Sequence, residues 1–298
     1  MWFKQCKAYR LPETPDAAVL AEALADMKFA PPQGLDWFCD GFDNPQPFTP
    51  LVFRAGETLG ICLRREEKVL PGAVVNDELA RRVVSIEVEE DRPVGRKEKQ
   101  DLKEQIIDEL LPRAFTRTSR TDAVLVGGYL LINQTGNKAE TLLGRLREAL
   151  GGLHAWTTTA HRSPSELMTE WLHNGEADGM FELDDYVVLV GAGDMAPEVR
   201  IKRKDVTAEE VVQHVKCGKR VAELGLVWRE SIAFVLTDKL TMKNIRYLDV
   251  LTEEAQGGDT AAEQAYASQV IMANTLTTML DELAELLGGW QELKTWQQ

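Results

Sequence analysis

Three short strand candidates near the end of the chain restrict its fold more than any other feature. The segments are 224–228, 232–236 and 243–248, and only the short connections 229–231 and 237–242 separate them. Parallel neighbours need a crossover of a dozen or more residues, whereas a short turn joins antiparallel strands. The three segments therefore predict an antiparallel meander.

Further strand and helix patterns alternate along the chain. Strands are expected at 2–11, 51–54, 58–63, 124–126, 129–132, 186–190 and 199–204. Apolar residues at helical spacing predict helices over 17–27, 75–86, 97–111, 138–150 and 259–287, and capping-box sequences at 163–166 and 207–210 predict the starts of two more. The proline-rich segment 30–50 is expected to be irregular. Groups of antiparallel strands separated by flanking helices indicate the α+β class.

Two successive charged helices between 71 and 112 have narrow apolar stripes. The first of them carries Val75, Leu79, Val83 and Ile86 on one face. Such helices are expected either to project from the body of the protein as an arm or, equally well, to lie on a sheet. With an arm, the chain divides into a central mixed α/β body, a charged helical arm and a C-terminal α+β region that ends in a long helix. These regions are 1–70 with 113–160, then 71–112, and then 161–298.

The overall charge is strongly acidic, but the acidic residues are unevenly distributed. The 298 residues carry a formal net charge of −14, and from Asp249 onward nine acids stand against one base, Lys294. The hydrophobic fraction of 44% is enough for a sizeable core. No apolar run approaches the roughly 18–20 residues of a membrane-spanning helix, and the start of the chain lacks the apolar stretch of a signal peptide. We therefore expect a cytoplasmic protein that does not bind membranes.

Residue types that usually carry catalysis are sparse and scattered. The four cysteines form no CxxC pair and the four histidines form no HExxH motif, so neither a disulfide framework nor a zinc site is expected. The sequence also lacks the glycine-rich phosphate-binding motifs and the nucleophile elbow of hydrolases. Acidic pairs such as Asp184-Asp185 and Asp281-Glu282 are more typical of solvated loops or helix faces than of a nuclease metal site. We expect no catalytic residues, no metal and no cofactor.

A first basic stretch extends from Arg92 to Arg120 and contains eight bases against five acids. Its last part carries Arg113, Arg117 and Arg120 without any acid, interleaved with threonine and serine. Arginine and hydroxyl side chains suit phosphate oxygens, which accept charged and neutral hydrogen bonds alike. On these residues alone, a solvated strand that follows a helix is the favoured interpretation.

A second basic stretch begins at Arg200-Ile201-Lys202-Arg203-Lys204. From Arg200 to Arg220 there are seven bases and three acids. In a strand, Arg200, Lys202 and Lys204 would share one face and Arg203 would lie on the other. Such a row of cations could follow a phosphate backbone. The competing interpretation is a charged edge strand that prevents aggregation.

Several short sequence segments, distributed over nearly the whole chain, give information about its family. They are Met1-Trp2-Phe3-Lys4 with Tyr9-Arg10-Leu11, RREEKVLP at 64–71, LLPRAFTR at 110–117, 138–140 leading to 150–151, LMTEW at 167–171, and 199–210 with its KRKDVTAEE core. In sequence and in order these segments resemble the recombination-associated protein RdgC family.

The resemblance implies a nucleoid protein that binds duplex DNA without sequence preference. Horseshoe-shaped subunits would form a homodimeric ring with duplex DNA in a positively lined hole, and the ring would restrain the recombinase RecA by competing for DNA. The DNA contacts that the resemblance implies are Lys97, Lys99, Arg113, Arg117, Lys202, Arg203 and Lys204, with Arg120 beside the matching motif. A ring needs cations only on its inner wall, so an acidic exterior is compatible with this function.

Two other functions stay open at this point. The first is an interaction factor that inhibits a recombination enzyme through the acidic C-terminal helix without gripping DNA. The second is a metal-dependent nuclease. Retention of linear duplex across a salt series, with and without magnesium, separates the three.

Overall fold

The computed structural model describes residues 2–191, 197–255 and 257–292. The chain forms two compact units. The first unit consists of 1–24, 44–62 and 121–298, and the second unit consists of 25–43 and 63–120. Strands β4 (Thr58–Val69) and β5 (Phe115–Val126) contribute residues to both units.

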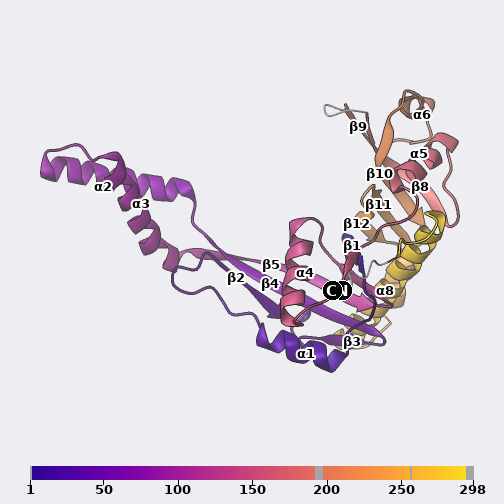
Figure 1. Cartoon of the computed structure of the whole chain (residues 1–298), viewed down its shortest axis with the longest axis horizontal. Coiled ribbons are helices and arrows are strands. Elements are labelled where there is room, and N and C mark those ends of the chain that lie inside the picture. Colours follow the sequence, from indigo (N-terminus) through magenta and orange to yellow (C-terminus); the bar gives the residue numbers. More distant parts are fainter. Residues whose placement is uncertain (1, 192–196, 256, 293–298) are drawn as a thin grey trace. The chain divides into compact units, whose positions relative to one another are not determined.

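The first unit contains most of a large antiparallel sheet (Figure 1). Its strands are β1 (Cys6–Arg10), β6 (Tyr129–Ile132), β8 (Phe181–Val190), β9 (Glu198–Lys202), β10 (Arg220–Trp228), β11 (Ile232–Thr237) and β12 (Thr241–Tyr247), with the short β3 (Phe53–Ala55) and β7 (Trp156–Thr157). Hydrogen-bonded neighbours follow the order β6-β1-β12-β11-β10-β8-β9. The predicted meander is confirmed, because β10 pairs with β11 and β11 with β12, both antiparallel.

Helices bury one face of this sheet. Three of them, α5 (Pro164–Asn174), α6 (Glu209–Lys216) and α8 (Ala261–Leu286), contribute Trp171, Val211, Met272 and Leu276 to the main core. Helical spacing places the apolar residues of α8 on one side, as the sequence predicts. The remaining helices of this part of the chain are α1 (Ala17–Asp26), α4 (Asn137–Ala149) and the unpredicted α7 (Asp249–Ala255). None of the described helices combines the length and the apolar character needed to cross a membrane.

The second unit pairs two charged helices with three strands. Helices α2 (Gly72–Glu90) and α3 (Arg96–Leu110) pack against each other and bury Val83 and Ile106. Arg82 of α2 also donates two hydrogen bonds to Glu109 of α3, at 3.1 and 2.6 Å. The strands are β2 (Phe38–Asp43) and the charged halves of β4 and β5, with β4 between the other two.

Segment 30–50 is mostly loop, as expected, but residues 38–43 within it form β2. The backbone N–H of Phe29 donates to the carbonyl of Phe42 at 2.8 Å, and the N–H of Phe42 donates to Met27. Gly41 permits this close approach, since a Cβ atom there would lie 2.6 Å from the Cα of Phe29. Glycine, which indicated a loop in the sequence, here lets two backbone segments meet.

Both predicted capping boxes lack the expected side-chain hydrogen bond. Ser163 occupies the N-cap of α5, but its hydroxyl does not cap the helix. Helix α6 begins after Ala208, and the hydroxyl of Thr207 donates instead to Asp205 at 2.6 Å. The same sequence thus forms a turn around Asp205, because a nearby carboxylate competes with the helix terminus for the hydroxyl.

Candidate nucleic-acid interface

Three of the predicted contacts lie on the exposed surface of the second unit without salt-bridge partners. Lys97 and Lys99 belong to the first turn of α3, and Arg113 ends a one-turn 3₁₀ helix (Leu111–Arg113) that follows α3. Among the residues that the structure describes, these three side chains form no salt bridge. Their charges are therefore available to an anion from outside the chain.

Arg117 and Arg120 of β5 are already engaged with carboxylates of the same unit. Arg117 donates to Glu67 at 3.2 Å, and Arg120 donates to Asp43 at 3.0 Å. Hydrogen bonds from Arg65 and Arg117 lower the pKa of the Glu67 carboxyl. The side chain of Arg117 is nevertheless 76% exposed, so water screens this pair and its carboxylate is easily exchanged.

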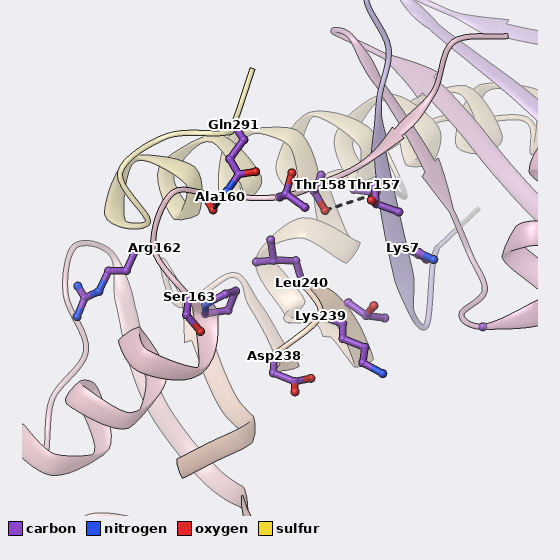
Figure 2. A pocket seen from close by; sticks show the side chains of 15 residues that line it. Lys7, Thr157, Thr158, Ala160, Arg162, Ser163, Asp238, Lys239, Leu240 and Gln291 are labelled. Atoms are coloured by element: carbon purple, nitrogen blue, oxygen red, sulfur yellow. Dashed lines mark hydrogen bonds between the residues drawn. The ribbon is translucent and has the colours of Figure 1, made fainter. Parts of the chain in front are cut away.

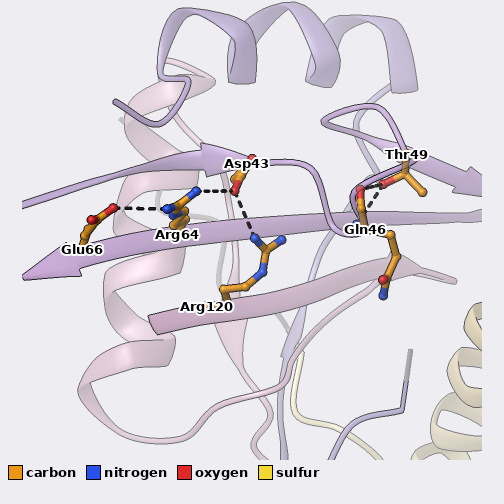
Figure 3. A network of polar contacts seen from close by, with 6 residues as sticks. All are labelled: Asp43, Gln46, Thr49, Arg64, Glu66 and Arg120. Atoms are coloured by element: carbon orange, nitrogen blue, oxygen red, sulfur yellow. Dashed lines mark hydrogen bonds and ion pairs between the residues drawn. The ribbon is translucent and has the colours of Figure 1, made fainter. Parts of the chain in front are cut away.

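Arg64 and Arg65 of β4 are two nearby arginines that the candidate set omits. Figure 3 shows Asp43 between Arg64 and Arg120, with Arg64 also bonded to Glu66. Arg64 lies 4.3 Å from the ring centroid of Phe29, and Arg65 lies 3.7 Å from that of Phe38. The alternation Arg64–Glu66 and Arg65–Glu67 in the sequence is the signal that could have placed one pair on each face of a strand.

The second basic stretch belongs to the first unit, and its geometry differs from the prediction. Strand β9 ends at Lys202, and Arg203 has a left-handed backbone with φ 55°, its N–H donating to the carbonyl of Asp185 at 2.8 Å. Lys204 lies beyond the strand and forms a salt bridge with Glu210 of α6. The expected row of Arg200, Lys202 and Lys204 on one strand face is therefore wrong, because the turn at Arg203 removes Lys204 from it.

The sheet surface next to β9 carries several salt bridges. Arg200 pairs with Glu198 at 3.0 Å, Arg246 pairs with Asp184 at 3.0 Å, and Lys243 pairs with Glu223 at 2.6 Å. These acids neutralise the neighbouring bases. Lys202 instead lies 5.5 Å from the ring centroid of Tyr186, and neither it nor Arg203 forms a salt bridge within the described part of the chain.

The hydroxyl of Tyr186 joins these salt bridges by a hydrogen bond to Glu223 at 2.8 Å. Burial, and then this hydrogen bond, raise the pKa of Tyr186 to about 12. Burial opposes the charge of Glu223, but hydrogen bonds from Lys243 and Tyr186 outweigh it and lower the pKa of the Glu223 carboxyl. Three bases near Lys202 are thus paired with acids of the same surface.

Comparison with known proteins assigns the chain to a family. A family model described as "RdgC: Putative exonuclease, RdgC" matches residues 1–290. A recombination-associated protein RdgC of Neisseria meningitidis serogroup C / serotype 2a is 56% identical over 98% of this chain and 100% of its own length. The chain belongs to the RdgC family. Proteins with the same name from Laribacter hongkongensis and Pseudomonas paraeruginosa are 46% and 38% identical, over 98% and 97% of this chain.

Three of the four acids considered for a nuclease metal are occupied in this RdgC-family chain. Asp281 accepts a hydrogen bond from Tyr129 at 2.6 Å, and Glu282 accepts one from Trp228 at 2.7 Å and pairs with Arg229. Asp184 pairs with Arg246. Across 2–191, 197–255 and 257–292, no group of three or more His, Cys, Asp or Glu side chains is arranged to hold a metal ion.

Proposed function

We propose that this RdgC-family protein binds duplex DNA without sequence preference and limits the access of a RecA-type recombinase to it. The observation that carries the proposal is that five of the expected DNA contacts are exposed cations without salt-bridge partners in the described part of an acidic chain. They are Lys97, Lys99, Arg113, Lys202 and Arg203. The names of the relatives, which refer to recombination, support the same biological setting.

In the proposed mode of binding, cations contact phosphates and no side chain reads a base edge. Arg113 and Arg117 form charge-assisted hydrogen bonds with phosphate oxygens, while Lys202 and Arg203 act on a second part of the backbone. Arg117, Arg120 and Lys204 exchange an internal carboxylate for phosphate. Each of these exchanges releases Glu67, Asp43 or Glu210 beside the DNA, so these three contribute less than the unpaired cations.

We further propose that two copies close into a ring around the duplex. Two basic clusters, the cations from Lys97 to Arg120 and those from Lys202 to Lys204, then line the inner wall. The acidic remainder of the chain, whose net charge as a whole is −14, repels DNA from the outside. A ring of this kind excludes a recombinase from the DNA it occupies without touching the enzyme. The proposed location is the nucleoid in the cytoplasm, and no chemistry is performed on the DNA.

A gel-shift titration of linear duplex tests the central claim. Two unrelated sequences are compared across a potassium chloride series, each with EDTA or with magnesium. We expect equal retention of both sequences, intact DNA with magnesium, and affinity that falls steeply with salt. Replacing all five unpaired cations by alanine should abolish the shift, whereas unchanged retention would overturn the proposal.

Nuclease activity is a second candidate, favoured by the description of the family model. In the same titration it predicts loss of intact duplex when magnesium is added and protection by EDTA. If the protein retains the duplex and the DNA stays intact with magnesium, nuclease activity is contradicted.

The interaction-factor alternative rests on the acidic C-terminal part of the chain. Helix α8 carries core residues such as Met272 and Met279, so deletion from Asp259 would unfold the first unit rather than test an interaction. A sharper test replaces the exposed Glu285 by glutamine in the full chain. The alternative predicts that inhibition of a recombinase is lost while duplex retention, if any, stays the same.

A further inference from the structure

A recess in the first unit lies apart from all the proposed DNA contacts. It has a volume of about 580 Å³ and lies between segment 157–164 and the turn 238–241, which joins β11 to β12. Figure 2 shows Thr158 and Ala160 on one side and Leu240 and Lys239 opposite, with Arg162 toward one end and Lys7 toward the other. Its volume lies within the range of about 300–1,000 Å³ typical of small-molecule sites.

Hydroxyl groups without partners line this recess. The side chains of Thr157, Thr159, Ser163 and Thr241 form no hydrogen bond with any residue that the structure describes. Thr241 is the most informative, because it is only 8% exposed and its backbone N–H, not its hydroxyl, bonds to Thr237. Its hydroxyl is not among the fully buried side-chain atoms without a partner, so it is open to the recess and can donate to a ligand there.

Cations outnumber acids in the lining. Lys239 lies on the exposed turn and forms no salt bridge with a described residue. Lys7 is held by Glu140 at 2.6 Å, and Arg162 is held by Glu170. Asp238 is the one acid in the lining. Lys239 is therefore the cation most available to a ligand in this recess.

We propose that the recess binds the phosphomonoester group of a nucleotide-sized molecule. Lys239 and the hydroxyl of Thr241 contact the phosphate oxygens, and Leu240 and Pro164 cover the apolar part of the ligand. A phosphomonoester carries a charge of about −1.5 to −2 and several strong acceptor oxygens, which match a point cation surrounded by hydroxyls. A carboxylate matches the site less well, because its planar pair of oxygens is best recognised by an arginine fork.

The phosphomonoester has two possible sources, a free nucleotide or the phosphorylated 5′ end of a DNA strand. Both present the same terminal group to the recess. The site goes beyond the proposed duplex binding, since its lining shares no residue with the two basic clusters.

Isothermal titration calorimetry on the full chain tests the proposal with 5′-dAMP, deoxyadenosine and succinate. We expect 5′-dAMP to bind and the other two probes not to bind. Lys239→Gln and Thr241→Val should each weaken 5′-dAMP binding at least tenfold, and both should fold normally, since one lies on an exposed turn and the other is isosteric. Lys4→Gln is the matched control, because Lys4 is an exposed cation of the same unit outside the recess.

A second arm compares short duplexes with 5′-phosphate and 5′-hydroxyl ends. Tighter binding of the phosphorylated end, lost in Lys239→Gln, identifies the DNA end as the source and supports the proposal. Absence of both 5′-dAMP binding and an end effect, equal binding of deoxyadenosine, or unchanged affinity in both variants would overturn it. Lys239→Gln should retain ordinary gel shifts of internal duplex, so failure of this site and failure of duplex binding are distinguishable.

Discussion

An exposed cation with a carboxylate partner and one without a partner have different effects on an incoming phosphate. Arg113 forms no salt bridge with a described residue, whereas Arg117 shares its charge with Glu67 at 3.2 Å. Binding through Arg117 exchanges one anion for another and leaves Glu67 beside the DNA. Two substitutions of opposite expected effect follow from this difference.

Arg113→Ala should weaken duplex binding equally for all sequences, and Glu67→Gln should strengthen it. The first change removes one phosphate contact, which reduces the slope of log affinity against log salt by about 0.9. The second releases the guanidinium of Arg117 and removes a repelling charge. Gel-shift titrations at several salt concentrations measure both. Arg81→Ala is the control, because Arg81 is an exposed arginine of the same unit outside the candidate set; equal slopes for all variants would contradict the assignment.

The pair formed by Glu223 and Lys243 should make stability depend on acid pH. The pKa of Glu223 is lowered below its usual value of 4.5, so the pair stabilises the fold at neutral pH and this contribution is lost as pH falls through the folded-state pKa. Glu223→Gln should lower the free energy of unfolding by about 1 kcal/mol at neutral pH, and the deficit should shrink toward about pH 3. Urea unfolding at both pH values measures it. Glu13→Gln, at an exposed position, should show no such deficit, and a pH-independent deficit for Glu223→Gln would contradict the pair's role.

Sequence reasoning names the residues of the candidate site but does not reveal their partners within the chain. Exposure of Lys97, Lys99 and Arg113 follows from their charge. The pairing of Arg120 with Asp43 does not, because the two residues are distant in sequence and meet only when β2 forms. Lys204 was misplaced for a local reason, since nothing in Lys202-Arg203-Lys204 signals the positive φ of 55° at Arg203.

Among the elements, a single polar side chain joins α8 to the hairpin of β3 and β4. Gln269 is 1% exposed, and its amide donates to the carbonyl of Phe53 at 3.0 Å and to the hydroxyl of Thr58 at 2.9 Å. Gly60 makes room for it, since a Cβ there would lie 2.3 Å from Oε1 of Gln269. The register between helix and hairpin depends on these contacts.

Gln269→Leu should destabilise the protein by about 2 kcal/mol, because it leaves the part-buried Phe53 carbonyl and the buried Thr58 hydroxyl without this donor. Chemical denaturation monitored by tryptophan fluorescence measures the change. Asn274→Leu, at an exposed position of the same helix, serves as the matched control and should change stability by less than about 0.5 kcal/mol. Equal effects of the two substitutions would show that the buried amide is not what holds this contact.

The sequence predicts best those elements whose apolar residues recur at a regular spacing. The meander β10–β12 and helix α8 each bury regularly spaced apolar residues. The spacing of these residues and the short turns between the strands identify both elements in the sequence. The outer half of β4 was missed because charged residues occupy both of its faces, from Arg64 to Lys68, whereas the outer half of β5 is the solvated strand that the sequence favoured after α3. Such strands are held by ion pairs between neighbouring strands, and these pairs leave no regular spacing in the sequence.

For the whole molecule, the balance of charge favours enclosure of DNA over surface adhesion. A protein with a net charge of −14 repels duplex at long range, and only locally concentrated cations can hold it. Contacts of that kind dissociate as salt rises. A closed ring adds retention that does not depend on salt, because the duplex can leave only through an end or an opening of the ring.

The proposed ring therefore predicts a difference between circular and linear DNA of the same sequence. Protein loaded at low salt should remain on closed circular duplex through a high-salt wash, and a single restriction cut should release it. Sedimentation after the wash, with the cut made before or after loading, measures retention. Linear duplex with both ends blocked by bulky groups is the matched control and should retain the protein like the circle. Light scattering should give a mass near twice 33.4 kDa. A monomeric mass, or equal loss from circle and open linear duplex, would contradict the ring and leave salt-sensitive phosphate contact as the whole of the binding.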